Sequence, residues 1–345
     1  MARRNNADPE DIVLPAERPV TLEGFAGHAR QVAVLQRSLE KGMLAQSLLF
    51  AGQEGLGKAT LAWKLAAALQ CASPTPWACG ECPSCRKMVK GLHPDVRIIT
   101  LEKRPNSDKM RTEIVIEQIR EDILKPIVYP PYEGNRLVFI IDPADLMNTS
   151  AQNCLLKSLE EPPRCVQFIL VARNSGRLKS TIRSRCQVFN FYPLPAQDME
   201  SVASRSGIKA KDRSKALALA AGAPGKLFDN NLKAQQKRRD RLITLLEAGL
   251  DLSRWDDAAK AAEALAKEDP QDVLLTALRL TADCMRCLAS GADSARPESG
   301  ELAEAARRRG ADGLARLSDR LAEAPEHLAH NVNTRLLWEH TFLVP

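Results

Sequence analysis

The sequence lacks three features that would each assign a protein to a broad class. No apolar run approaches the roughly 20 residues that cross a bilayer, so a membrane-spanning protein is excluded. The first 19 residues, MARRNNADPEDIVLPAERP, contain no apolar stretch of the signal-peptide kind, and we expect a cytoplasmic protein without disulfides. The net charge is only +6, which permits contact with nucleic acid but is weaker than the clustered basic surface that would establish it.

Aromatic residues are also scarce, at 4% of the chain. Hydrophobic residues make up 44% and charged residues 27%, a composition typical of a helix-rich globular protein rather than a disordered one. A chain of 345 residues can bury two or three separate cores. We therefore expect several domains.

A glycine-rich segment, GQEGLGKAT at 52–60, follows the short apolar run QSLLFAG and precedes the helical pattern KATLAWKLAAAL. Strand, loop and helix in this order are the context of a phosphate-binding loop, in which backbone N–H groups and a lysine hold phosphate oxygens. The residues that match the motif are Gly52, Gly55, Gly57 and Lys58.

One position of the motif departs from the pattern. Ala59 stands where Ser or Thr normally ligates Mg²⁺, and Thr60 lies about a third of a turn further round the helix. The glycines and the lysine still form an anion-binding nest at a helix N-terminus. The sequence leaves open whether this nest holds ATP, ADP, phosphate or nothing.

A second candidate for nucleotide chemistry is Asp142, at the end of the apolar run RLVFIID. ATPases place a Mg²⁺-binding carboxylate at such a strand end, and active ones follow it with a Glu that polarises the attacking water. Here Pro143 follows, and we do not expect Asp145 to substitute for the missing Glu. A strand-end carboxylate that caps the next turn is the alternative interpretation of Asp142.

Four of the nine cysteines fall close together, with the spacing C-x7-C-x2-C-x2-C, at Cys71, Cys79, Cys82 and Cys85. In a reducing compartment, four thiolates in one short segment favour a structural tetrahedral Zn²⁺. An iron–sulfur site and a loop with incidentally clustered thiols are the weaker alternatives. Cys284 and Cys287 also form a C-x2-C pair, but within a helical pattern, where we expect them to be small core residues.

The segment STIRSRCQVF contains Arg185 between a helical stretch and a strand. An arginine there can project from the domain and reach the γ-phosphate held by a neighbouring subunit. Arg183 and Lys179 stand nearby, so a solvated basic surface is the competing interpretation.

The order of elements indicates an α/β domain followed by helices. Short β-branched runs, DVRIITL, RLVFIID and VQFILVA, alternate with helical stretches, which predicts a parallel sheet flanked by helices. After FNFYPLPAQD only Ala-, Leu- and Arg-rich helical sequence remains. We expect an α/β domain at 1–195 with the cysteine module inserted at 71–85, a small all-α unit at 196–235 and a larger all-α unit at 236–345.

Together these motifs resemble the clamp-loader subunits of the bacterial replicative DNA polymerase, and within that AAA+ family its delta-prime branch. The resemblance covers about residues 20 to 195 and rests on GQEGLGKAT, the cysteines directly after the loop's helix, HPDV, EIVIEQIRED, LLKSLEEPP and STIRSRC. GAPGKL at 222–227 resembles the turn of the family's lid domain. Residues 236–345 match only in helical character and position.

The resemblance implies an AAA+ α/β domain, an all-α lid and an all-α collar that joins five subunits in a ring with gamma/tau and delta. It implies zinc on the four cysteines and a place in the DNA polymerase holoenzyme that loads the sliding clamp on primed DNA. It implies a non-hydrolysing stator that presents Arg185 to the adjacent ATPase subunit. The residues that it would place at the nucleotide are Gly52, Gly55, Gly57, Lys58, Thr60 and Asp142.

Ala59 and Pro143 both remove catalytic elements, so we expect no ATP hydrolysis by the isolated chain, although ATP or ADP binding stays open. Three other interpretations compete with the stator: an active gamma/tau-like ATPase, a nucleotide kinase with a zinc lid, and an AAA+ component of another DNA-processing complex. The cysteines directly after the loop's helix argue against the kinase. Measured turnover and pull-down with clamp-loader subunits separate the other two.

Overall fold

The computed structural model describes residues 18–73, 77–103, 110–206, 208, 210–228, 232–248, 255–290, 299–329 and 332–343. Most of the expected polar leader and three residues of the cysteine module, 74–76, lie outside this part of the chain. The chain divides into two compact units, residues 1–202 with 222–225 and residues 203–221 with 226–345. The predicted division into three domains stays a prediction.

The first unit is built on a five-stranded parallel sheet with the order β2-β3-β4-β1-β5. Its strands are β1 (Ser47–Ala51), β2 (Val96–Ile99), β3 (Leu137–Ile141), β4 (Val166–Ala172) and β5 (Gln187–Asn190). The three central strands, β1, β3 and β4, are buried along their whole length. This burial on both faces explains why their sequences are continuous apolar runs instead of alternating patterns.

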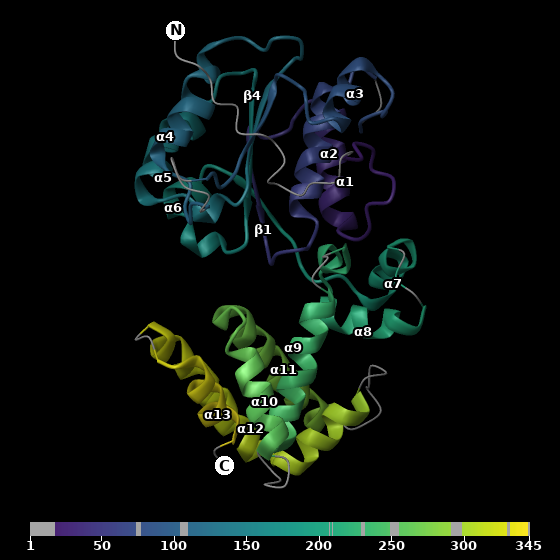
Figure 1. Ribbon diagram of the computed structural model, residues 1–345. Coiled ribbons are helices and arrows are strands. Elements are labelled where there is room, and N and C mark those ends of the chain that lie inside the picture. The colour runs from purple at the N-terminus through teal and green to yellow at the C-terminus, as the bar shows by residue number, and fades with distance from the viewer. Residues whose placement is uncertain are drawn as a thin grey trace. The chain divides into compact units, whose positions relative to one another are not determined.

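Helices cover both faces of this sheet (Figure 1), with α1, α2 and α3 on one side and α4, α5 and α6 on the other. Their bounds are α1 (Ala29–Glu40), α2 (Lys58–Gln70), α3 (Pro83–Val89), α4 (Ile116–Gln118), α5 (Thr149–Glu160) and α6 (Ser180–Arg183). Alternate strand residues divide between two cores. Phe50 and Ile140 pack with α1, α2 and α3, whereas Leu49 and Phe139 belong to the core on the opposite face. The predicted α/β class is confirmed.

A buried carboxylate fixes the loops at one edge of the sheet. Asp95 is 2% exposed, and its oxygens accept hydrogen bonds from the backbone N–H groups of Tyr132, Glu133 and Gly134 at 2.5, 2.9 and 2.6 Å. Three such bonds satisfy a buried carboxylate without a cation. The loop after α3 and the loop before β3 are thereby held together.

The second unit is all-α among its described residues, as predicted for this part of the chain. It contains α8 (Ala210–Ala220), α9 (Leu232–Ala248), α10 (Trp255–Leu265), α11 (Pro270–Ser290), α12 (Ser299–Ala329) and α13 (Thr334–Leu343), while α7 (Ala196–Arg205) crosses the division between the units. Its core includes the buried Trp338, Phe342 and Cys284. Cys284 is thus a core residue, as expected, and Cys287 is half-buried one turn further along α11.

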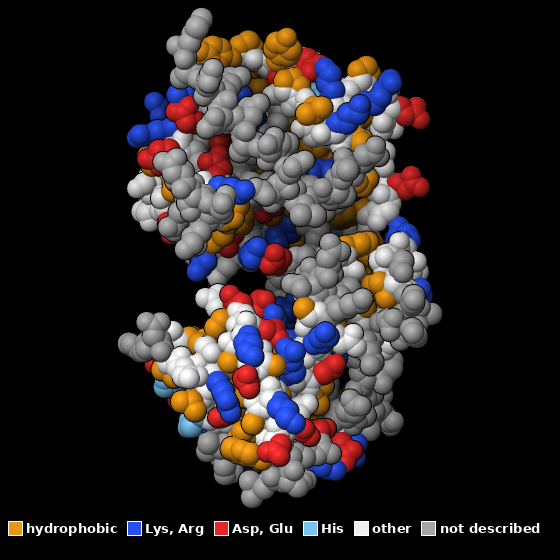
Figure 2. All heavy atoms as spheres, viewed as in Figure 1, with side chains coloured by type: hydrophobic (Ala, Val, Ile, Leu, Met, Phe, Trp, Pro, Cys, Tyr) orange, Lys and Arg blue, Asp and Glu red, His pale blue; other side chains and the backbone are white. Residues whose placement is uncertain are grey.

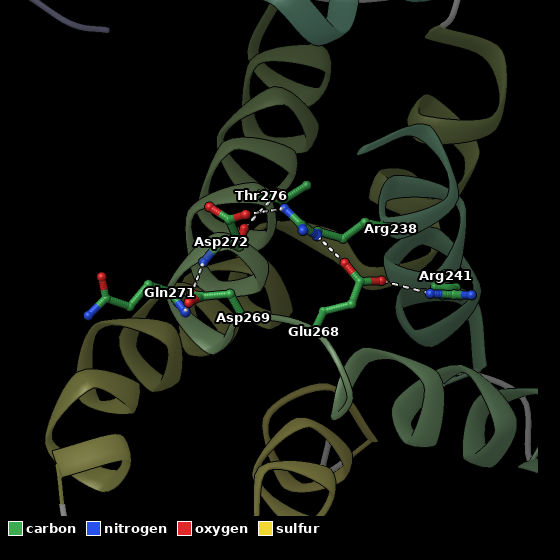
Figure 3. Close-up of polar contacts among 7 residues, drawn as sticks. All are labelled: Arg238, Arg241, Glu268, Asp269, Gln271, Asp272 and Thr276. Carbon is green, nitrogen blue, oxygen red and sulfur yellow. Dashed lines mark hydrogen bonds and ion pairs between the residues drawn. The ribbon is translucent and has the colours of Figure 1, made fainter. Parts of the chain in front are cut away.

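Charged residues connect the helices of this unit (Figure 3). Arg238 of α9 forms ion pairs with Glu268 and with Asp272 of α11, the latter at 3.2 Å, and Arg241 contacts Glu268 at 2.7 Å. The side chains of Arg238 and Glu268 are only 10% and 19% exposed. On the visible outer surface of the same unit, Lys and Arg side chains are interspersed with Asp and Glu (Figure 2), so this surface carries no single sign of charge. No helix in the described part of the chain is both long and apolar enough to span a bilayer.

Candidate functional site

The glycine-rich loop connects β1 to α2 at the carboxyl end of the sheet. Gly52, Gly55 and Gly57 all have positive φ, at 149°, 79° and 85°. A side chain at Gly52 would also collide with the Phe191 carbonyl, 2.4 Å from the position of its Cβ. Glycine is therefore required by backbone conformation, and at Gly52 by close packing as well. The strand, loop and helix predicted from the motif are present with the expected bounds.

Three carbonyl oxygens of the loop are hydrogen-bonded, two to residues outside the loop and one to Lys58. Leu56 O lies 2.9 Å from His28 Nε2, and Gly55 O accepts from the Gly225 N–H at 2.7 Å. Gln53 O accepts from Lys58 Nζ at 2.6 Å. Across a trans peptide the N–H points opposite to the C=O. Anchoring these carbonyls therefore directs the following N–H groups the other way, which is the arrangement of an anion-binding nest.

His28 has no counterpart in the sequence-based expectations for this site. It adopts a left-handed conformation, with φ 54°, directly before α1, and its ring lies 4.6 Å from that of Phe191. Burial lowers the pKa of His28, against the opposing effect of its hydrogen bond to Leu56. Because a carbonyl oxygen can only accept, Nε2 of His28 is the donor of this hydrogen bond to the loop. A lone His before a helix carries no sequence signal for this role.

Lys58 and Asp142 act on each other electrostatically. Lys58 is 5% exposed, and burial lowers its pKa although Asp142 acts to raise it. Burial raises the pKa of Asp142 to about 6, against the opposing effect of Lys58 and Arg173. Both predicted residues therefore lie in one site, with Asp142 directly after β3 and Lys58 at the start of α2.

Two positions of the motifs, that of the Mg²⁺-ligating hydroxyl and that of the water-polarising glutamate, carry no suitable side chain. Ala59 and Thr60 are both exposed at the start of α2, and Ala59 offers only a methyl. Asp145 is buried, and its two oxygens accept from the backbone N–H groups of Arg173 and Asn174 at 3.0 and 3.1 Å. Its carboxylate is thus engaged in holding the segment after β4. Pro143 has no side-chain group for proton transfer.

Sequence reasoning missed Arg173. It follows β4 directly, and β4 pairs with β1, so that Gly52 N–H donates to Ala172 O at 3.2 Å. The Arg173 guanidinium lies 2.9 Å from the Glu54 carboxylate within the glycine loop. The sequence does contain one signal that could have identified Arg173, namely a basic residue directly after an apolar strand. Only the pairing of β1 with β4 places that cation beside the loop.

The four cysteines converge into one cluster, whose Sγ atoms all lie within 4.8 Å of one another. Cys71 Sγ and Cys82 Sγ are 4.0 Å apart, and Cys79 Sγ and Cys85 Sγ are 3.9 Å apart. A tetrahedron with Zn–S bonds of about 2.3 Å has S···S edges of about 3.8 Å. These two distances lie close to that edge, so the cluster fits a four-coordinate metal, and no two of these sulfurs form a disulfide.

Backbone N–H groups surround these sulfurs. Ser73 and Cys79 donate to Cys71 Sγ at 3.3 Å each, and Cys85 donates to Cys82 Sγ at 3.4 Å. Burial alone would raise the pKa of Cys82, but the backbone N–H groups of Ala72 and Cys85 and the thiols of Cys85 and Cys79 lower it to about 6, whereas burial raises the pKa of Cys85. These surroundings favour the thiolate form of Cys82, which is the form that ligates a metal.

Arg185 lies apart from the loop, between α6 and β5, and is exposed. Its guanidinium donates to Thr181 O at 2.8 Å and forms an ion pair with Glu160, the last residue of α5. Arg183, at the end of α6, is also exposed. The pairing holds Arg185 in one direction, and Glu160 is a third residue that the sequence reasoning had not singled out.

Comparison with known proteins gives a consistent result for the first unit. Residues 27–195 match the family described as "DNA polymerase III, delta subunit". The delta' subunit of Pseudomonas aeruginosa is 36% identical over 201 residues, which cover 57% of this chain and 58% of that protein. The delta' subunit of Escherichia coli is 34% identical over 193 residues, covering 55% and 56%.

A tau subunit is also similar. The DNA polymerase III tau subunit of Escherichia coli is 31% identical over 217 residues, which cover 61% of this chain and 32% of that protein. The chain thus spans about half the length of the delta' relatives that it matches. Among solved structures, a DNA polymerase III gamma subunit-related protein of Thermotoga maritima aligns with a TM-score of 0.43 at 17% identity, covering 90% of this chain and 97% of that one.

Proposed function

We propose that the chain, whose residues 27–195 match the family described as "DNA polymerase III, delta subunit", is a delta-prime-type subunit of a clamp loader. In this proposal it joins gamma/tau and delta subunits in a cytoplasmic heteropentameric ring that opens the sliding clamp and loads it on primed DNA. The chain acts in this ring as a stator, which supports the motor subunits without hydrolysing ATP itself.

The observation that carries the stator role is the loss of both catalytic elements around an otherwise well-formed loop. Ala59 cannot ligate Mg²⁺, Pro143 cannot polarise water, and the Asp145 carboxylate is occupied by two backbone N–H groups. Hydrolysis in this class requires the metal and an oriented water. The loop keeps Lys58 and its nest, so the proposal assigns it binding without turnover.

The exposed position of Arg185 supports the proposal that this residue contributes to catalysis in a neighbouring subunit. It is exposed, and its partner Glu160 belongs to the same unit, so the guanidinium is held at the surface rather than within a core. An arginine that approaches a γ-phosphate from another subunit stabilises the charge of the transition state. We assign Arg185 this role toward the adjacent motor subunit.

The cysteine cluster is assigned a structural Zn²⁺, held by Cys71, Cys79, Cys82 and Cys85. Four thiolates complete a tetrahedron and leave no open position for substrate. The ion would join the end of α2 to the start of α3 and so fix a segment that contributes Met88 and Cys85 to the core. Its contribution is therefore to folding.

The test of the function is reconstitution from separately purified proteins. We expect the chain to co-purify with gamma/tau and delta as a stoichiometric member of a five-subunit ring, and to show only background ATP turnover when alone. The gamma/tau-like alternative, favoured by the similarity to a tau subunit, predicts turnover by the isolated chain that Lys58→Ala abolishes. That result, or a ring that assembles fully without this chain, would refute the stator.

A further inference from the structure

Two cations and two anions surround the glycine loop. Lys58 donates to the loop carbonyl of Gln53, and Arg173 pairs with Glu54 of the same loop. Arg173 directly follows β4, which pairs with β1, and its charge also acts on both Lys58 and Asp142. Both cations therefore contact loop atoms that a bound oxyanion could replace.

In a complete phosphate-binding loop, Mg²⁺ supplies part of the positive charge opposite the outer phosphate oxygens. Here the hydroxyl that would hold the metal is absent at Ala59. An arginine offers a planar donor fork that binds phosphate oxygens bidentately and stays charged at every physiological pH. Arg173 thus has the chemistry to replace a metal charge at this position.

We propose that the loop binds a diphosphate-containing ligand without a divalent metal, with Arg173 supplying the positive charge that Mg²⁺ supplies in a catalytic site. This inference rests on the phosphate-binding loop of the proposed function, but not on ring assembly or on Arg185. The ligand class is a nucleoside diphosphate or free pyrophosphate, since the preformed contacts described above address phosphate groups.

The rearrangement needed for binding is small. The side chains of Arg173 and Glu54 are 54% and 62% exposed, and ion pairs of such exposure contribute little net stability. Exchange of the Glu54 carboxylate for a phosphate oxygen on Arg173 therefore costs little. Glu54 acts as an internal competitor, because it both occupies the guanidinium and repels an incoming anion.

The experiment is isothermal titration of the purified full chain with ADP and, separately, with pyrophosphate, each in EDTA and in Mg²⁺. We expect binding in EDTA and no strengthening by Mg²⁺. Arg173→Ala should weaken it about tenfold or more, as expected for loss of a charge-assisted bidentate contact, and Glu54→Gln should strengthen it several-fold. Arg177→Ala removes an exposed arginine four residues further along the same segment and should leave the affinity unchanged.

A gain-of-metal variant completes the design. Ala59→Thr restores the hydroxyl of the motif, and its affinity for ADP should become higher in Mg²⁺ than in EDTA. Thermal melting of each variant verifies folding. Stronger binding of pyrophosphate than of ADP identifies a phosphate site without a base pocket, and the reverse identifies a nucleotide site.

Three results would overturn the inference. The first is no heat of binding with either ligand at concentrations up to about 1 mM, which corresponds to a binding free energy weaker than about −4 kcal/mol. The second is binding that requires Mg²⁺, and the third is an equal loss of affinity in Arg173→Ala and Arg177→Ala. None of these results would affect ring assembly. Failure of the ring assay would likewise leave the titrations unchanged, so the two proposals fail separately.

Discussion

Glu160, the last residue of α5, forms an ion pair with Arg185, which stands just before β5. The guanidinium also donates to Thr181 O at 2.8 Å, so two separate elements orient it. Glu160 is the first of the two acidic residues in the segment LEEPP, and Arg185 is the central residue of SRC. Two motifs that are distant in the sequence thus meet in one surface pair.

The first prediction concerns this arginine. In a reconstituted ring, Arg185→Ala should lower the DNA- and clamp-stimulated ATPase while the chain still folds and assembles, because exposed residues contribute little to stability. An arginine finger is worth on the order of 10³-fold at its own site. The loss for the whole ring is smaller, since the other motor sites keep their own arginines.

Arg183→Ala is the matched control, as it removes an exposed arginine two residues away. Arg185→Lys should also be impaired, because an ammonium cannot make the planar bidentate contact. If the ring with Arg185→Ala hydrolyses ATP and loads clamps at the wild-type rate, both residues belong to a solvated basic surface.

Glu160→Gln tests whether the ion pair positions Arg185. The variant keeps the size of the side chain but removes its charge, so we expect a smaller loss of ring ATPase than with Arg185→Ala. Combining the two changes should cost no more than Arg185→Ala alone, since residues that act through one another are not additive. Full additivity of the two losses in the same assay would contradict a positioning role.

The cysteine module should contain one tightly bound zinc per chain. Removing the metal with a strong chelator, or the Cys82→Ser substitution, should lower the melting temperature of the first unit by several degrees or more, because metal binding and local folding are coupled. Cys165→Ser is the control, since Cys165 lies outside the cluster. Elemental analysis without zinc in protein that never met a chelator would contradict the assignment.

The raised pKa of Asp142 predicts that the stability of the protein depends on pH. Burial raises its pKa to about 6, above the ordinary 3.8. The folded state therefore binds the proton more tightly, and stability falls as the pH rises from about 4 through 6. Asp142→Asn should raise the free energy of unfolding at pH 7.5 by about 1–3 kcal/mol and change it little at pH 4.

Asp145→Asn provides the opposite control for this prediction. Asp145 accepts two backbone hydrogen bonds through its two oxygens, and an amide can accept through only one. We expect a loss of about 1–2 kcal/mol at neutral pH. Chemical denaturation at both pH values measures the two variants together, and equal effects of Asp142→Asn at pH 4 and 7.5 would exclude a raised pKa.

The ion-pair network of the second unit should contribute measurably to stability. Arg238→Ala leaves the half-buried Glu268 with only Arg241, and we expect a loss of about 2–3 kcal/mol, somewhat below the cost of fully isolating a buried charge. Lys267→Ala breaks an exposed pair with Glu263 and should cost less than about 0.5 kcal/mol. Scanning calorimetry of the full chain measures the stability loss in each of the two variants. Similar losses in Arg238→Ala and Lys267→Ala would refute the contribution of the network.

The sequence by itself determined the features that depend on neighbouring residues. The glycine loop between β1 and α2, the cysteine cluster, the buried strands and the helical second half all follow from local spacing and periodicity. Local patterns suffice there because φ angles, thiol spacing and apolar runs are properties of a short segment. Gly55 and Gly57 are glycines because the backbone of their own loop has positive φ there, whereas Gly52 also packs against the distant Phe191 carbonyl.

Tertiary structure decided the partners of those features. Arg173 reaches Glu54, His28 holds Leu56 O, and Glu160 pairs with Arg185, and no spacing in the sequence brings these residues together. Asp145, two residues after Pro143, contacts the segment after β4 instead of the loop. The physical reason is the strand order, in which β1 lies between β4 and β5. The carboxyl ends of parallel strands that are distant in the sequence lie side by side, and the residues that follow these ends form the site.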